Sequence, residues 1–162
     1  MKIRIRRAVQ ADTPAMARLH EELIESARKK QVTNEDIAAI ENFYQRVLSN
    51  EDVVYFVAVA SNEIVGQAAC SFFPAKPSSR NPAGLACYLH AVSVTASERN
   101  KGIGKELVTA LLKHCRDRGV GYITLDATEM GQPVYRSLGF TDTHNVYLEM
   151  WKAQLEALDL GD

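Results

Sequence analysis

The sequence has 162 residues, of which 46% are apolar and 24% are charged, and its formal net charge is −1 at pH 7. This length fits one domain with a buried core, so we expect residues 1–162 to form a single domain. The balanced charge argues against a nucleic-acid surface, and the longest apolar run, Val53–Ala60, is far too short to cross a membrane.

The amino-terminal residues, "MKIRIRRAVQ", are charged and lack the apolar stretch of a secretory signal peptide. The chain has three cysteines, Cys70, Cys87 and Cys115, which stand far apart and form no Cys-x-x-Cys motif. This pattern is typical of reduced thiols in a cytoplasmic protein, and we expect no metal site. Cys70 and Cys115 are interpreted as small hydrophobic core residues.

The first elements are a strand and two helices. Ile3 and Ile5 alternate with basic residues, which predicts a half-buried strand. Asp12-Thr13-Pro14 predicts a helix start, with a capping side chain and a proline in the first turn. Thr33 and Asp36 predict a second helix that opens with a capping box. The apolar stripes of these helices are Met16, Leu19, Leu23, Ile24 and Ala27, then Ile37, Ile40, Phe43 or Tyr44, and Val47.

A hairpin is predicted next. Val53–Ala60 has the composition of a strand, Ser61-Asn62-Glu63 that of a turn, and Ile64–Phe73 that of the returning strand. Residues 74–84 contain three prolines and two serines, so we expect a surface loop. Leu85–Val94 is the following strand.

The carboxyl-terminal part alternates helices and strands. A helix follows the glycines, carries Ile103, Leu107, Leu111 and Cys115 at four-residue spacing, and ends at Gly119. Tyr122–Ala127 is a strand, residues 131–138 are a short helix that ends at Gly139, and Asn145–Trp151 is the last strand. The order β-α-α-β-β-β-α-β-α-β mixes hairpins with a strand–helix–strand crossover. It predicts a three-layer α/β/α arrangement around one mixed sheet.

Two glycines and three basic residues stand at the mouth of the third long helix, in Arg99–Lys105 ("RNKGIGK"). The first N–H groups of a helix are unpaired, and glycine lets a ligand approach the backbone closely. The segment therefore suits an anion such as a pyrophosphate. A Walker loop is excluded because Glu106 follows Lys105, and a dinucleotide fingerprint because Leu107 stands in place of its third glycine.

The run "VSVTASERNKGIGKELVTALL" resembles the acyl-coenzyme A signature of the GCN5-related N-acetyltransferase (GNAT) superfamily, Arg/Gln-x-x-Gly-x-Gly/Ala, at Arg99, Gly102 and Gly104. "GQPVYRSLGF" resembles the family's Tyr-x-x-x-Gly-Phe segment, and "IRRAVQADTPAMARL" its first strand and helix. The resemblance implies the GNAT-like acyl-CoA N-acyltransferase fold, classed as α/β or α+β, whose mixed sheet splays apart centrally. The splay falls between the fourth and fifth strands, here Leu85–Val94 and Tyr122–Ala127.

The resemblance also implies the activity, which is acetyl transfer from acetyl-CoA, as co-substrate, to a primary amine of a small molecule or protein. Tyr135 stands where the family places its general acid, and a backbone N–H from Val92–Val94 would stabilise the oxyanion. The implied cofactor-binding residues are Val92, Val94, Arg99, Asn100, Lys101, Gly102, Ile103, Gly104 and Lys105.

The general base is left open by the sequence. Family members often carry a glutamate at the positions of Tyr88 or Leu89, and His90 is the nearest titratable group here. Asp126, Glu129 or a chain of waters are the alternatives. Thr128 stands where the family frequently has an asparagine, which removes one customary contact to the pantetheine arm. An acyl-enzyme on Cys87 is disfavoured, since no histidine and acid can be assigned to activate it.

Two other functions stay open. The chain could be a non-catalytic acetyl-CoA-binding sensor or interaction module, or a domain that binds a mononucleotide. Five glutamates in the first two helices could favour a cationic acceptor, or they could simply be solvated: Glu21, Glu22, Glu25, Glu35 and Glu41. Superfamily members often dimerise, and residues 146–151 would lie either in a homodimer interface or in the core.

Overall fold

The computed structural model describes residues 2–28, 32–143, 150 and 152–157. The predicted last strand, Asn145–Trp151, lies outside the described residues apart from Met150. The strands are β1 (Arg4–Arg7), β2 (Val53–Ala60), β3 (Glu63–Pro74), β4 (Leu85–Val94) and β5 (Tyr122–Thr124). The helices are α1 (Thr13–Arg28), α2 (Asn34–Leu48), α3 (Ile103–Asp117), α4 (Gln132–Ser137) and α5 (Lys152–Glu156), with 3₁₀ turns at Gln10–Asp12 and Ala96–Glu98.

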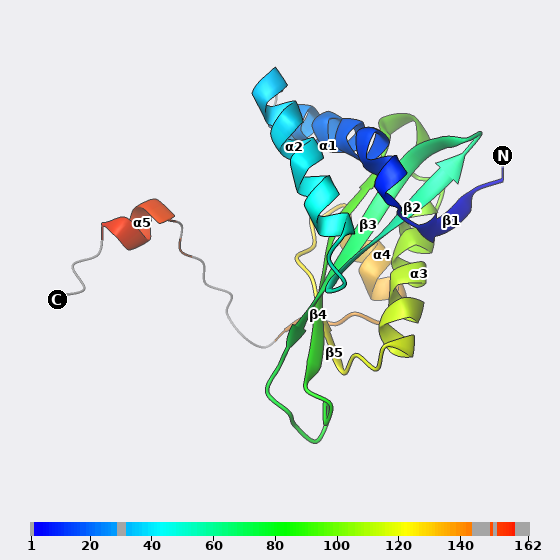
Figure 1. The fold of residues 1–162 in the computed structure, drawn as a ribbon. Helices are drawn as coiled ribbons and strands as arrows, with labels where there is room; N and C mark the ends of the chain where they lie inside the picture. The colour runs from blue at the N-terminus through cyan, green and yellow to red at the C-terminus, as the bar shows by residue number, and fades with distance from the viewer. Residues whose placement is uncertain (1, 29–31, 144–149, 151, 158–162) are drawn as a thin grey trace.

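The strands form one mixed sheet in the order β1-β2-β3-β4-β5. Neighbours are antiparallel except for β4 and β5, which are parallel and are joined through α3. Helices α1 and α2 cover one face of the sheet and α3 covers the other (Figure 1). The predicted three-layer fold with a mixed sheet is therefore confirmed.

The β2–β3 hairpin turns through Ser61 and Asn62, which both have positive φ, 48° and 67°. Two such residues are the signature of the tight turn that matches the twist of paired strands. Glu63, predicted as part of the turn, already pairs with Ala60 in the sheet. Strand β5 is shorter than predicted because its pairing with β4 ends at Thr124.

The two amino-terminal helices begin where the sequence predicts, but by different means. Thr33 Oγ1 accepts the N–H of Asp36 and the Asp36 carboxylate accepts the N–H of Thr33, which is the predicted capping box. Asp12 does not cap α1 as predicted. Its carboxylate instead accepts a hydrogen bond from the N–H of Val9 and a bidentate pair of hydrogen bonds from the Arg6 guanidinium, at 2.6 and 2.8 Å.

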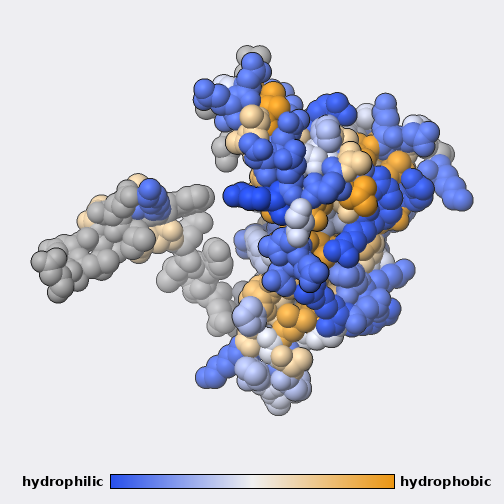
Figure 2. All heavy atoms as spheres, viewed as in Figure 1, coloured by the Kyte–Doolittle hydropathy of each residue, from blue (hydrophilic) through white to orange (hydrophobic). Residues whose placement is uncertain are grey.

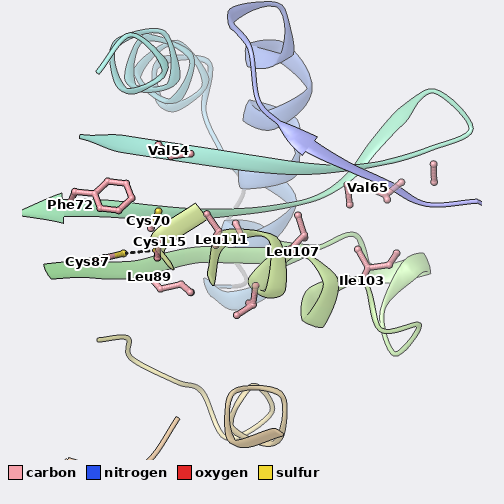
Figure 3. Packing of buried hydrophobic residues seen from close by; sticks show 14 residues of the cluster. Val54, Val65, Cys70, Phe72, Cys87, Leu89, Ile103, Leu107, Leu111 and Cys115 are labelled. Atoms are coloured by element: carbon pink, nitrogen blue, oxygen red, sulfur yellow. Dashed lines mark hydrogen bonds between the residues drawn. The ribbon is translucent and has the colours of Figure 1, made fainter. Parts of the chain in front are cut away.

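Each face of the sheet has its own hydrophobic core. The α3 face is built from alternate residues of β2, β3 and β4 and from the α3 row that includes Leu107 and Leu111 (Figure 3). On the other face, Met16, Ile40 and Tyr44 of α1 and α2 pack against Tyr55 and Val57. The described residues on the face seen in Figure 2 are largely hydrophilic. Within the described residues, no helix is long and apolar enough to cross a bilayer.

Candidate active site

A β-bulge interrupts β4 in the middle of the sheet. Gln67 pairs with Ser93 and Ala69 with His90, so Ala91 and Val92 together face the single residue Ala68. Ala91 adopts φ 53°, which is unusual for a residue that carries a Cβ atom. Such bulges bend a strand and often lie beside functional sites. Here the bulge lies within the part of β4, from Leu89 onward, that has β3 as its one neighbour among the described strands.

The edge of β4 is open beyond this region. Strand β5 pairs with Ala86, Cys87 and Tyr88 only, so among the described residues no strand covers the edge from Leu89 to Val94. Thr95 N–H donates a hydrogen bond to Val65 O. The adjacent pair, Gly66 and Val94, is therefore a non-hydrogen-bonded pair of the antiparallel ladder. The amide of Val94 therefore points away from β3, toward the open edge. An extended ligand with peptide-like groups could pair with it as an added strand.

The open edge leads directly to the amino terminus of α3. Asn100 and Gly102 have positive φ, 63° and 83°. These two left-handed residues change the direction of the chain just before α3 begins. Among the residues that the structure describes, no side chain caps α3, so its first N–H groups have no side-chain acceptor there. A Cβ atom added at Gly102 or at Gly104 would meet nothing within 4 Å. Free donors, the helix dipole and open space together make this end of α3 suited to an anion.

The basic residues of this turn have distinct partners. Arg99 Nε donates to Val94 O at 3.0 Å and so fastens the loop to the end of β4. Lys101 pairs with Glu98 at 3.1 Å. Glu22, from α1, accepts the N–H of Ala96 at 2.9 Å, which ties the start of the loop to the opposite layer. From the sequence, Glu22 was one of five helix glutamates that could favour a cationic acceptor. Its contact with Ala96 could not be predicted, because no local pattern links residues 74 positions apart.

Tyr135 lies on α4, on the α3 side of the sheet. It is half-buried, packs against the cluster that contains Leu89 and Leu107, and meets the Phe140 ring edge-on with centroids 5.9 Å apart. Its hydroxyl makes no hydrogen bond to any residue that the structure describes, and burial raises its pKa. Tyr135 also lines a cavity of about 960 Å³ between α4, β5 and residues 138–143, together with Asp126.

His90 lies on the other face of β4. Its Nε2 is 2.8 Å from Ser71 Oγ, its ring stacks on Tyr88, and the Tyr55 ring meets it edge-on. Burial lowers the pKa of His90, so the imidazole is held in its neutral form. The structure therefore places Tyr135 and His90 on opposite faces of the sheet, with no ring contact or hydrogen bond between them.

The remaining candidates for acid–base chemistry have different surroundings. Asp126, just beyond β5, accepts a hydrogen bond from the Tyr88 hydroxyl at 2.9 Å, which bridges the gap where the two strands part. Glu129 is exposed. Thr128 Oγ1 accepts the N–H of Gly131 and so shapes the turn into α4. Cys87 is fully buried, and the hydrogen bond with the Cys115 thiol, together with burial, raises its pKa to about 12, so it is not an available nucleophile.

A polar chain that the sequence did not predict lies behind the bulge. Gln67 Nε2 donates to Tyr44 Oη at 2.8 Å, and Tyr44 Oη lies 3.2 Å from His20 Nδ1. Gln67 is only 2% exposed. The three side chains come from β3, α2 and α1, so they join both helices to the strand that pairs with the bulge.

Comparisons with known proteins agree with this geometry. The family model described as the Acetyltransferase (GNAT) family matches residues 15–140. N-acetyltransferase 8F1 of Rattus norvegicus is 30% identical over 100 residues, which are 60% of this chain and 43% of that protein. N-acetyltransferase 8B of Homo sapiens is 33% identical over 66 residues, 39% of this chain and 29% of that protein. The matched regions span less than half the length of both relatives.

Solved structures share the fold at low sequence identity. A predicted acetyltransferase from Clostridium acetobutylicum with acetyl-CoA has a TM-score of 0.77 at 24% identity, over 92% of this chain and 96% of that one. The aminoglycoside N-acetyltransferase AAC(6')-Iy in complex with CoA has a TM-score of 0.75 at 19% identity, over 93% and 95% of the two chains. An aminoglycoside acetyltransferase from an uncultured soil metagenomic sample, in complex with sisomicin, has a TM-score of 0.71 at 21% identity, again over 93% and 95%. Because the family model covers well over half of the sequence, the chain belongs to the GNAT family of acetyltransferases.

Proposed function

We propose that this protein binds acetyl-CoA along the open edge of β4 and transfers the acetyl group to a primary amine by direct attack. One observation carries the proposal. The part of β4 that no described strand covers runs into a helix amino terminus whose N–H groups have no side-chain cap and whose glycines face open space. A strand edge suits the amide groups of a pantetheine arm, and the helix end suits a pyrophosphate.

In this proposal the pantetheine arm pairs with the backbone at Val92 and Val94, and the pyrophosphate binds the turn that begins at Arg99. The backbone N–H groups of this turn would be the main donors, since Arg99 Nε already donates to Val94 O and Lys101 pairs with Glu98. The residues proposed to hold the pyrophosphate are Arg99, Asn100, Lys101, Gly102, Ile103, Gly104 and Lys105.

The acceptor amine must be neutral before it can attack the thioester carbon. We assign its proton to His90, directly or through a water, because the lowered pKa of His90 leaves the imidazole free to accept a proton at neutral pH. Ser71 would orient the ring through Nε2. Asp126, held by Tyr88, is the alternative base.

As the C–N bond forms, negative charge develops on the acetyl oxygen, and a backbone N–H of Val92–Val94 would stabilise it. Collapse of the tetrahedral intermediate breaks the C–S bond and releases a thiolate. Tyr135 would then donate its phenolic proton to the sulfur. Burial raises the pKa of Tyr135, which keeps the phenol protonated at neutral pH. The same apolar surroundings disfavour the charged thiolate, so they would raise the pKa of the leaving thiol and favour its protonation.

The acceptor is proposed to be an amine of a small molecule or of a protein. Two of the structural relatives are aminoglycoside acetyltransferases, which supports a small-molecule amine. Glu25 and Glu35, on α1 and α2, are exposed and would favour a cationic acceptor on that side of the sheet.

A second candidate is a module that binds acetyl-CoA without turning it over. Two features favour it. The positions of Tyr88 and Leu89 carry no carboxylate, and Thr128 is engaged as a turn cap. Binding is expected under both candidates, whereas turnover is expected only under the first.

Calorimetric titration with acetyl-CoA, CoA and ATP tests the binding step. Tight binding of acetyl-CoA and CoA, with ATP far weaker, is the expected result. Preference for ATP would favour a mononucleotide site and overturn the assignment of β4. A thiol-release assay over a panel of amines then separates an enzyme from a binding module.

A further inference from the structure

All three cysteines of the chain meet in one place in the core. Cys70 comes from β3, Cys87 from β4 and Cys115 from the last turn of α3, and each is fully buried. Their sulfur atoms lie within 4.8 Å of one another, and those of Cys87 and Cys115 are 3.8 Å apart (Figure 3). The sequence predicts Cys70 and Cys115 as separate core residues and Cys87 beside the cleft, because nothing in the spacing of the cysteines shows that the fold will gather them.

The sheet register explains the cluster. Cys70 pairs with Leu89 and Cys87 with Phe72, so the two strand cysteines are diagonal neighbours on the face that α3 covers. Helix α3 then lays Cys115 over both. The proposed acetyl transfer uses none of the three thiols.

The spacing of the sulfurs fits three thiolates on one central atom. Sulfurs bound at about 2.3 Å to a three-coordinate centre lie about 4 Å apart when the centre is planar and about 3.4 Å apart when a lone pair makes it pyramidal, so side-chain movements that draw the sulfurs together would complete such a site. Among the described residues, no fourth histidine, cysteine or carboxylate belongs to the group. A central atom held here would therefore have three ligands from these residues, all of them soft sulfurs.

The net charge of the occupied cluster depends on the charge of the ion that the three thiolates would bind. With three thiolates, a monovalent ion leaves a net charge of −2, a divalent ion leaves −1, and a trivalent ion leaves none. The surroundings are apolar, with Leu89, Leu111 and Phe72 in the same cluster, and a buried net charge is costly there. The Arg118 guanidinium lies over the Phe72 ring, 4.1 Å from its centroid, but it already donates hydrogen bonds to Asp52 and to the carbonyl of Glu51.

We propose that Cys70, Cys87 and Cys115 form a binding site for a trivalent thiophilic metalloid, of which arsenic(III) is the probe. Arsenous acid would exchange its three hydroxyl groups for the three sulfurs. Three As–O bonds break, three As–S bonds form, and each thiol proton leaves with a hydroxide as water. No electron is transferred, and the product carries no charge.

The thiols are buried, so binding requires a local opening. Cys115 lies two residues before the end of α3 at Asp117, and helix ends open at a lower free-energy cost than helix centres. Once bound, the arsenic would link β3, β4 and α3. Arsenic binding should therefore raise the melting temperature of the protein.

The test uses the full-length chain, kept reduced with a phosphine that carries no thiol, and sodium arsenite. We expect one arsenic per chain by mass spectrometry, with the loss of three hydrogens, and X-ray absorption should find three sulfur neighbours and no oxygen. One or two sulfurs with residual oxygen would overturn the proposal, as would a chain whose three thiols all remain free. Tighter binding of zinc(II) or copper(I) than of arsenite would overturn the charge argument.

Variants separate a built site from ordinary thiol chemistry. Cys70→Ala, Cys87→Ala and Cys115→Ala should each weaken arsenite binding by roughly 100-fold, since a chelate loses one of its linked ligands. Ser71→Ala, next to Cys70 but outside the cluster, should bind as the natural chain does. The unfolded chain in guanidinium holds the same three thiols, so equal affinity there would show that the fold contributes nothing. Neither readout depends on acetyl transfer.

Discussion

Gly104 offers a sharp test of the proposed pyrophosphate site. Gly104→Val adds a branched side chain to the first turn of α3, where a Cβ atom would meet no described atom within 4 Å beyond the adjoining residues and the backbone of α3 itself. Because Cα–Cβ bonds tilt toward the amino end of a helix, the added methyl groups would project toward the uncapped N–H groups. The change should therefore leave the fold intact and obstruct the anion.

The two expected effects differ in size. In a helix, valine is better tolerated than glycine by a few tenths of a kcal/mol, so the free energy of unfolding should change by less than about 0.5 kcal/mol. A hydrogen bond to a charged group contributes about 1.5–3 kcal/mol, and losing one corresponds to a loss of affinity of roughly 10- to 100-fold. Binding should thus suffer far more than stability.

Calorimetry with acetyl-CoA and urea unfolding measure the two quantities on the same preparation. Lys113→Val is the matched control, since it places valine at an exposed position in α3, well away from the turn. The control should bind acetyl-CoA as the natural chain does. If Gly104→Val bound acetyl-CoA with unchanged affinity, the pyrophosphate could not lie against the first turn of α3.

Three further predictions concern the proposed acid, the proposed base and the stability of the fold. Tyr135→Phe should lower kcat by about 100-fold with acetyl-CoA affinity unchanged, since the proton is needed only as the thiolate leaves; an equal kcat in steady-state assays would refute the acid role. His90→Gln should remove the acidic limb of the pH–rate profile. In the natural chain this limb should lie below about pH 6.5, because burial lowers the pKa of His90; an unshifted limb would point to Asp126 or to water. Asp12→Asn should lower the free energy of unfolding at pH 7 by about 1–3 kcal/mol in urea titrations, because Arg6 loses its charged partner. Arg6 holds the pKa of Asp12 below its usual value, so this stabilisation is fully present above about pH 4 and is lost as the pH falls through the lowered value; a difference that persists in strong acid would contradict the ion-pair account.

Much of the fold could be predicted because local signals agree with the final contacts. The runs at Val53–Ala60 and Leu85–Val94 are strands with the predicted bounds, since apolar residues fill both and turn residues flank both. Thr33 caps α2 through a contact made within four residues, and Gly119 ends α3 with a positive φ. Each of these features depends on neighbours in the sequence.

The parts that could not be predicted depend on distant residues. Ala91 has no intrinsic preference for positive φ, and only the mismatch between β3 and β4 imposes it. Asp12 is a residue type that often caps helices, yet its carboxylate accepts hydrogen bonds from Arg6 of β1 and from the N–H of Val9 instead. Residues 125–127 continue the apolar pattern of β5, but no described strand pairs with them there. The cysteine cluster likewise exists only through the packing of α3 on the sheet.

The most direct test of the central claim is the release of free CoA thiol from acetyl-CoA across a panel of small-molecule and peptide amines. The natural chain should release thiol with at least one amine far faster than acetyl-CoA hydrolyses alone, and Tyr135→Phe should lose most of that rate. Tight acetyl-CoA binding without thiol release for any amine, in the natural chain and in Tyr135→Phe alike, would contradict acetyl transfer and leave the binding module as the function.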